Sequence, residues 1–441
     1  MVPLVALLGR REQRAAATGY VQGLLMPGQR KSIEPMAARL GVPSQRLQQF
    51  VTDSPWDENA LWGVIRRRVL PHLEPIEAWI VDETGWLKQG RHSVGVARQY
   101  CGAVGKRANC QVSVELVVSD GQVAAPGGGR LYLPQSWIDD PARRAKAGVP
   151  PEVGFATKPQ IALALIEQAL ADGVAPAPVL ADAAYGNGFG FRQRLRSLGV
   201  EFFLQVTPQE HQAWTEEVPT VLNGKYRTVD EAIAARARSL REIARALPAE
   251  AWQPCRWRTA NGKPQQTRLA WQEVFLARGL KEPQGQLEKC WLVVDWPQDA
   301  PAPYHCYLAH FHRAPSKARC LKLSRSRWHV EHYFQRSKDD LGLDHYEGRS
   351  WRGFHHHLVL AALAYLFILS IYLASKKSSG LSWERILEAI RPWLLRSTGS
   401  CPFCRASFPA QIDDSTGQSH TSWGVPCSHR LRASMASTPR R

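Results

Sequence analysis

The segment 327–338 holds one acid between bases at helical spacing. Arg327 precedes Glu331 by four residues and Lys338 follows it by seven, which places all three on one face of a helix. Gln335 shares that face. A neighbouring apolar face is formed by Val330, Phe334 and Leu341. The solvent-exposed face of an ordinary amphipathic helix can show the same spacing of charges, so this segment alone does not assign Glu331 a chemical role.

Two aspartates stand at the ends of apolar runs far upstream. Asp82 ends the run in "IEAWIVDETGW" and Asp182 ends the run in "PVLADAAYG". We expect each where a buried strand emerges into a turn, a common site position in open sheets. Together with Glu331 they would supply hard oxygen ligands for two Mg²⁺ ions, which activate a water or 3′-hydroxyl and stabilise the leaving oxygen of a phosphodiester. Taken singly, each acid has an ordinary alternative as a helix cap or surface charge.

Nearby acids are less suited to this role. Glu83 should point to the strand face opposite Asp82, because neighbouring side chains alternate along a strand. Asp339 and Asp340 lie about two turns beyond Glu331 and lack the same register with the bases. We therefore place these three acids second.

Strands alternate with helices through the middle of the chain, which predicts a mixed α/β sheet. Strands are expected in 76–82, 110–119, 178–182, 201–206 and 303–311, and helices in 159–171 and 189–198. Residues 208–303 change character, from charged helical sequence to Trp-rich strands with an Asn261-Gly262 hairpin, and predict an insertion between the halves of the main domain.

The first 70 residues read as helical. Within them, "EPMAARLGVPSQRLQQFV" predicts two short helices that turn at Gly41, a pattern typical of a helix-turn-helix, although any small bundle can show it. The run 358–374 is apolar, but its 17 residues include tyrosines and a serine, which favours a buried core helix over a membrane span. The preceding His355, His356 and His357 cannot share a helix face and are interpreted as a polar helix start.

Bulk properties indicate a soluble globular protein of two or three structural units. The chain has 441 residues and a formal net charge of +17, which favours nucleic acid as partner, while general solubility is the alternative. An odd count of nine cysteines and no secretion signal at the start predict the reducing cytoplasm. In the basic tail, Cys401, Cys404, His420, Cys427 and His429 fit no common zinc finger, and free thiols are expected.

Three blocks make the chain resemble the DDE transposases of bacterial insertion sequences. They begin at "VDETGWLKQGRHSVG", "LADAAYG" and "RWHVEHYFQRSKDD", and the resemblance covers about residues 80–375. It implies an RNase H-like fold in which Asp82, Asp182 and Glu331 form the metal site, with two Mg²⁺ ions and Mn²⁺ as a substitute.

One branch of those enzymes carries a Tyr, Arg, Glu, Lys signature with gaps of two, three and six residues. Arg327, Glu331 and Lys338 match it, whereas Ser324 stands at the Tyr position, so no role of that Tyr is carried over. The resemblance implies that Arg327 and Lys338 contact the DNA backbone near the cut. It further implies double-stranded DNA partners, namely terminal inverted repeats and target, a homodimer on DNA, no membrane, and a nucleoid-associated bacterial protein.

The implied reaction is water attack at an element end, followed by attack of the released 3′-hydroxyl on target DNA. Two alternatives stay open: a DNA-binding protein without activity, and a metal-dependent nuclease that cuts without joining. The expected organisation is an N-terminal helical domain, a catalytic domain in two parts around the insertion, and a disordered tail. The N-terminal domain is expected at 1–70, the two catalytic parts at 71–207 and 304–395, the insertion at 208–303 and the tail at 396–441.

Overall fold

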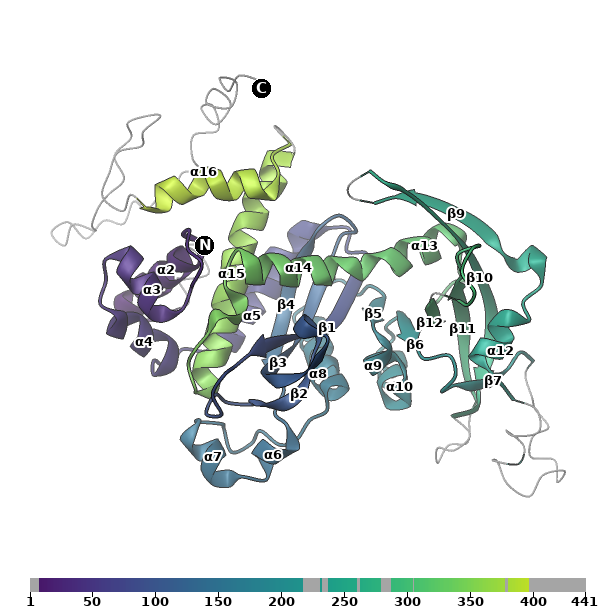
Figure 1. Cartoon of the computed structure of the whole chain (residues 1–441), viewed down its shortest axis with the longest axis horizontal. Helices are drawn as coiled ribbons and strands as arrows, with labels where there is room; N and C mark the ends of the chain where they lie inside the picture. The colour runs from purple at the N-terminus through teal and green to yellow at the C-terminus, as the bar shows by residue number, and fades with distance from the viewer. Residues whose placement is uncertain are drawn as a thin grey trace.

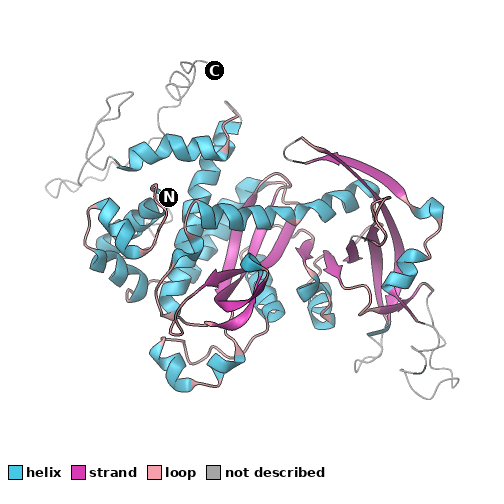
Figure 2. Ribbon diagram, in the orientation of Figure 1, coloured by secondary structure: helices cyan, strands magenta, loops and turns pink. Residues whose placement is uncertain are grey.

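The computed structural model describes residues 8–216, 231, 237–259, 262–278, 287–303, 305–376 and 380–395. They form a large mixed sheet flanked by helices (Figure 1, Figure 2). The prediction of free thiols in the tail falls outside these residues.

The strands are β1 (Ala78–Leu87), β2 (Ala97–Cys101), β3 (Lys106–Ser119), β4 (Ala124–Leu131), β5 (Val179–Ala181), β6 (Phe202–Val206), β7 (Gln212–Trp214), β8 (Arg238–Ser239), β9 (Gln253–Arg258), β10 (Pro264–Leu276), β11 (Glu288–Asp295) and β12 (His305–His310). The α-helices are α2 (Arg11–Leu25), α3 (Ile33–Leu40), α4 (Ser44–Thr52), α5 (Glu58–Val64), α6 (Gln135–Ile138), α7 (Pro141–Lys146), α8 (Lys158–Ala171), α9 (Ala183–Gly186), α10 (Phe189–Ser197), α12 (Leu240–Arg245), α13 (Lys317–Ser326), α14 (Trp328–Asp339), α15 (Trp351–Lys376) and α16 (Trp383–Leu395).

The sheet is organised around β1. On one side β1 pairs antiparallel with β3, which also pairs with β2 and β4, and on the other side it pairs parallel with β5. β5 then pairs parallel with β6. Because β1 and β5 run in the same direction as neighbours, residues at the same level on the two strands lie side by side.

The position expected for Asp82 at a strand end is wrong. Ala78 to Val81 form a fully buried start to β1, but the strand continues through Asp82 to Leu87 because β3 stays paired with it over that whole length. Asp182, by contrast, does follow directly after the last residue of β5.

The Trp-rich segment continues the same sheet. β12 pairs antiparallel with β6 and also with β11, which pairs with β10. The strands of 208–303 are therefore joined to the β1 side through β12. The predicted hairpin is present between β9 and β10, and the φ angle of Gly262 is +75°, which a glycine adopts without strain. In the described part of the predicted charged helix, Glu231 and the residues of α12 are helical.

A long helix, α15, forms the centre of the helical layer. It is long and apolar enough to cross a membrane by length and composition, but its residues from Trp351 to Leu366 are buried in this fold with the single exception of Arg352. The prediction of a buried core helix is confirmed for this part. α2 and α4 pack against it, so the N-terminal helices share its core (Figure 1).

The interpretation of the three histidines as a polar helix start is wrong. His355, His356 and His357 lie in the first turns of α15 but are buried, because each meets a different partner. His356 lies 2.9 Å from both the Val51 and Trp56 carbonyls, and His357 lies 2.8 Å from the Tyr20 hydroxyl. Burial lowers the pKa of each histidine to about 4.

Candidate active site

Asp82 lies on β1 at the same level as Asp182, which directly follows the neighbouring parallel strand β5. Ile80 of β1 pairs with Leu180 of β5, and each aspartate follows two residues after its member of that pair. Asp182 is the N-cap of α9, where its Oδ1 accepts a hydrogen bond of 2.9 Å from the Ala184 amide. This cap fixes the carboxylate at the carboxyl end of β5.

Close packing keeps α9 in place. A Cβ added to Gly186, the last residue of α9, would lie 2.1 Å from the Gln205 carbonyl oxygen of β6. Only glycine therefore permits the helix to approach β6 so closely. The helix that Asp182 caps is held against the sheet as a result.

Arg327 joins Asp82 to Glu331. It occupies the junction between α13 and α14, where one guanidinium nitrogen lies 2.8 Å from Asp82 Oδ2 and the other lies 2.6 Å from Glu331 Oε1. The side chain of Asp82 is 14% exposed and that of Glu331 is 52% exposed, so the pair spans from the sheet to the surface. The structure thus brings Glu331 within one guanidinium group of Asp82.

Lys338 is at the other end of the same helix. Its ammonium donates a hydrogen bond of 2.8 Å to the Gly85 carbonyl, which fastens the last turn of α14 to β1. Ser324, which stands at the Tyr position of the signature, donates a hydrogen bond of 2.9 Å to the Leu321 carbonyl of its own helix. The apolar face of α14 is buried as predicted through Val330 and Phe334.

The two aspartates carry raised pKa values. Burial raises the pKa of Asp82 to about 7, and the charge of Asp182 adds to the rise while Arg327 opposes it. Burial also raises the pKa of Asp182, and the charge of Glu83 adds to that rise. Desolvated acids that repel one another are a common feature of functional sites, because a bound cation relieves the repulsion.

The sequence reasoning missed Glu115. This residue lies directly opposite Asp82 in the β1–β3 pairing and is fully buried. It accepts hydrogen bonds of 2.9 Å from Ser113 and 3.0 Å from the Tyr333 hydroxyl of α14. A lone acid inside the apolar run 110–119 was the signal that could have revealed it, since a buried carboxylate needs polar partners.

Glu83 contacts α8 and α9, whereas Asp82 meets Arg327, as expected for neighbouring residues on opposite faces of a strand. Glu83 contacts Lys158 of α8 and accepts a hydrogen bond of 3.0 Å from the Tyr185 hydroxyl of α9. Asp340 instead accepts a hydrogen bond of 2.9 Å from the Trp383 indole of α16. Both acids therefore have structural partners.

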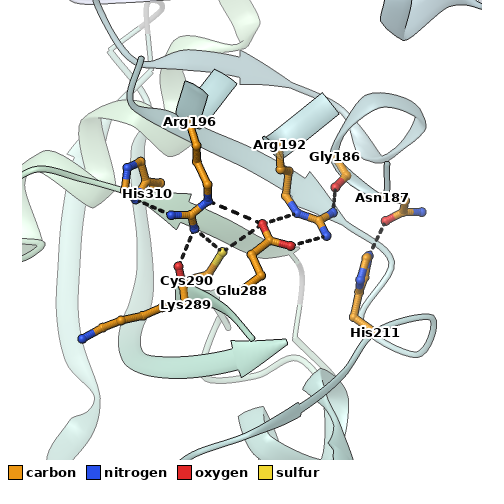
Figure 3. Close-up of polar contacts among 9 residues, drawn as sticks. All are labelled: Gly186, Asn187, Arg192, Arg196, His211, Glu288, Lys289, Cys290 and His310. Atoms are coloured by element: carbon orange, nitrogen blue, oxygen red, sulfur yellow. Dashed lines mark hydrogen bonds and ion pairs between the residues drawn. The ribbon is translucent and has the colours of Figure 1, made fainter. Parts of the chain in front are cut away.

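A buried ion pair supports the helix that Asp182 caps (Figure 3). Arg192 of α10 donates two hydrogen bonds of 2.9 Å to Glu288 of β11 and one of 2.6 Å to the Gly186 carbonyl, and Arg192 and Glu288 are fully buried. Arg196 approaches the same carboxylate at 3.7 Å and lies 2.9 Å from His310 Nδ1. The Trp-rich strands are thereby linked to the end of α9.

The three acids carry the type of ligand atom that binds a divalent metal. Asp82, Asp182 and Glu331 offer carboxylate oxygens, which Mg²⁺ prefers, and two of them already share one cation in Arg327. Among the described residues, no three His, Cys, Asp or Glu side chains are grouped closely enough to hold a metal ion. Glu331 would have to leave Arg327 and move toward the aspartates to complete such a site.

Residues 3–264, more than half of the chain, match the family described as DDE superfamily endonuclease. This span starts earlier than the predicted 80–375 and contains Asp82 and Asp182, but it ends before Glu331.

A curated relative is the "Probable transposase for insertion sequence element IS701" of Microchaete diplosiphon. It is 30% identical over 201 residues, which cover 43% of this chain and 50% of that protein. The chain therefore spans about half the length of this relative. A solved structure of the piggyBac transposase synaptic complex with hairpin DNA aligns with a TM-score of 0.44 at 11% identity, covering 89% of this chain and 75% of that one.

Proposed function

Because the chain belongs to the DDE superfamily endonuclease family, we propose that it is the transposase of a bacterial insertion sequence. In this proposal it cuts DNA at the element ends and joins the 3′-hydroxyl ends to target DNA. The observation that carries it is the placement of Asp82 beside Asp182, with Glu331 joined to Asp82 through Arg327.

We assign the catalytic core to the RNase H-like class. The order β4-β3-β1-β5-β6, with antiparallel pairs on one side of β1 and parallel pairs on the other, supports this assignment. The proposed division keeps the catalytic parts at 71–207 and 304–395, the helical domain at 1–70, the insertion at 208–303 and the tail at 396–441.

The proposed metal ligands are Asp82, Asp182 and Glu331, for two Mg²⁺ ions or Mn²⁺ as a substitute. Bound divalent ions would lower the pKa of the attacking water or hydroxyl and offset the charge on the leaving oxygen. The N-cap of α9 holds Asp182 at a fixed place, and Arg327 would turn from the carboxylates to a DNA phosphate beside the cut.

Lys338 is proposed to contact the DNA backbone while it holds α14. A lysine ammonium has three donors, and one of them meets the Gly85 carbonyl. Two donors therefore stay available for a phosphate near the α14 face that carries Glu331.

The N-terminal helices are proposed to read DNA sequence. Gly41 ends α3 in a left-handed conformation, with φ +66°, and α4 follows three residues later. The exposed face of α4 presents Gln45, Arg46, Gln48 and Gln49. Arg and Gln are side chains that pair with base edges in the major groove, which supports terminal repeats as the partner. Because the two ends of the element must be brought together, we propose that the protein acts as a homodimer on DNA. Its proposed location is the bacterial nucleoid.

The test is cleavage of DNA that bears the sequences flanking the protein's own gene. Purified protein, Mg²⁺ and a target plasmid are combined, and wild type is compared with Asp182→Asn and with the exposed control Asp139→Asn. We expect wild type and control to release and insert 3′ ends, whereas Asp182→Asn binds DNA without cutting it. Cutting by Asp182→Asn at the normal rate would overturn the metal assignment, and cutting without any insertion would identify a nuclease instead.

A further inference from the structure

A two-stranded ribbon formed by 253–258 and 264–268 projects from the sheet. β10 pairs with β11 only from Leu269 onward, so its first residues have β9 as their partner in the described sheet. The six residues of β9 span about 20 Å at the usual rise per residue. Figure 1 shows β9 and the start of β10 extending beyond the rest of the sheet, toward the side on which α14 lies.

One face of the ribbon is docked on α13. The Arg325 guanidinium lies 4.1 Å from the centre of the Trp257 ring and 2.6 Å from the buried carboxylate of Asp295. Cys255 is buried on the same side of the ribbon as Trp257. Arg325 precedes Arg327 by two residues, so the ribbon is attached beside the junction that holds Asp82 and Glu331.

The opposite face of the ribbon is exposed and cationic. Side chains alternate along a strand, so Arg256 and Arg258 point away from Trp257, and Gln266 lies opposite Arg256 on β10. Lys263 is exposed at the turn. The segment 253–269 contains no acid, and Arg256 and Lys263 form no ion pair with a residue that the structure describes.

The other basic side chain of this segment has a supporting role. The Arg268 guanidinium lies 4.9 Å from the Trp252 ring and 5.3 Å from the Trp296 ring, which orders it at the base of the ribbon. Arg258 donates a hydrogen bond of 3.0 Å to the Gly262 carbonyl, which orders its side chain near the tip. Ordered guanidinium groups lose less freedom when they bind a phosphate.

We propose that this ribbon is a DNA-binding arm whose Arg256, Arg258 and Lys263 contact the phosphates of double-stranded DNA next to the cut. The charge of the exposed face matches a polyanion, and a two-stranded ribbon is of a size that the major groove admits. Docking on α13 then delivers the bound duplex to the Arg327 junction. This inference rests on the proposed function, because that function supplies DNA as the partner.

The experiment measures how the dissociation constant depends on salt. Fluorescence anisotropy follows binding of duplex DNA from the flanks of the gene between low and moderate salt. The triple variant Arg256→Ala/Arg258→Ala/Lys263→Ala should lower the slope of log Kd against log salt by about two to three, since each phosphate contact contributes about 0.9. Its affinity at physiological salt should fall more than about tenfold.

Two controls separate charge from folding. Arg194→Ala/Arg245→Ala/Lys289→Ala removes three exposed cations elsewhere and should leave the slope unchanged. Arg256→Lys/Arg258→Lys keeps the charge and should keep the slope. Circular dichroism and the melting temperature show that each variant is folded.

A ribbon variant with the wild-type slope would overturn the inference, even if the protein cuts and joins DNA. An equal loss of slope in the ribbon variant and the remote control would overturn it too. Cleavage by the wild type is scored separately, so a failure of the proposed function appears as an absence of cutting, whereas the ribbon is judged on the slope alone.

Discussion

Arg327 stands between Asp82 and Glu331 and binds both carboxylates through separate guanidinium nitrogens, at 2.8 Å and 2.6 Å. The internal cation therefore holds the position in which a divalent ion would bring the same two groups together. Any divalent ion that uses both carboxylates has to displace the guanidinium.

Arg327→Gln should make the protein more responsive to divalent ions. Without the guanidinium, the mostly buried Asp82 loses its cation, and the free energy of unfolding at pH 8 should fall by about 1–3 kcal/mol. Mg²⁺ would then supply the missing charge, so its effect on the melting temperature should exceed that in wild type by about 2 °C or more. Arg319→Gln, which breaks the ion pair with Glu201, is the matched control. Equal Mg²⁺ effects in wild type and Arg327→Gln would show that the two cations do not compete.

Lys338→Met should weaken both the fold and DNA binding. Loss of the bond to the Gly85 carbonyl should lower the free energy of unfolding by about 1–3 kcal/mol, as for other hydrogen bonds from charged groups. Loss of a phosphate contact should lower the salt slope of DNA binding by about one. Lys338→Arg retains the charge and should preserve the slope. A lower stability with an unchanged slope would limit Lys338 to fastening α14.

Glu115 should make the metal-free protein less stable as the pH rises. Burial raises the pKa of Glu115 to about 7, whereas the unfolded chain has the ordinary value. The folded state then binds more protons between about pH 4 and pH 7, so the free energy of unfolding falls as pH rises across this range. Glu115→Gln should remove on the order of 2 kcal/mol of that fall, measured by urea unfolding at pH 5 and pH 7.5. The exposed control Glu34→Gln should keep the wild-type dependence, and the same dependence in Glu115→Gln would refute the assignment.

Breaking the Arg192–Glu288 pair should be costly. Glu288→Ala leaves a fully buried guanidinium without its carboxylate, and about 3–5 kcal/mol of the free energy of unfolding should be lost. The double variant Arg192→Met/Glu288→Leu should recover part of this loss, because neither charge is then buried alone. Glu167→Ala, which removes the partner of the exposed Arg194, should cost less than about 1 kcal/mol. Similar losses at the two sites, measured by urea unfolding, would contradict this account.

Local spacing predicted the helix that carries Glu331, because the one-face arrangement of Arg327, Glu331 and Lys338 depends on the regular turn of α14. Apolar runs likewise predicted β1 and β5, and the helix before β5. The extent of β1 past Asp82 could not be read in this way, since it depends on pairing with β3, a contact across the sheet.

Burial of polar groups was the harder part to predict. His355, His356 and His357 were expected at a polar surface, and Glu115 was overlooked in an apolar strand. In each case the partner that makes burial possible is remote in the chain, as Tyr20 is for His357 and Tyr333 is for Glu115. Such partners become known only once the chain is folded.

The histidines of α15 tie the N-terminal helices to the middle of the molecule through Tyr20, Val51 and Trp56. With the proposed roles, the N-terminal DNA-binding helices and the metal site would then be held at a fixed distance from each other along the duplex. Inserting half a helical repeat of DNA between the recognised sequence and the cleavage position would place the two on opposite sides of the duplex. Inserting a whole repeat would return them to the same side but leave them too far apart for this fixed distance.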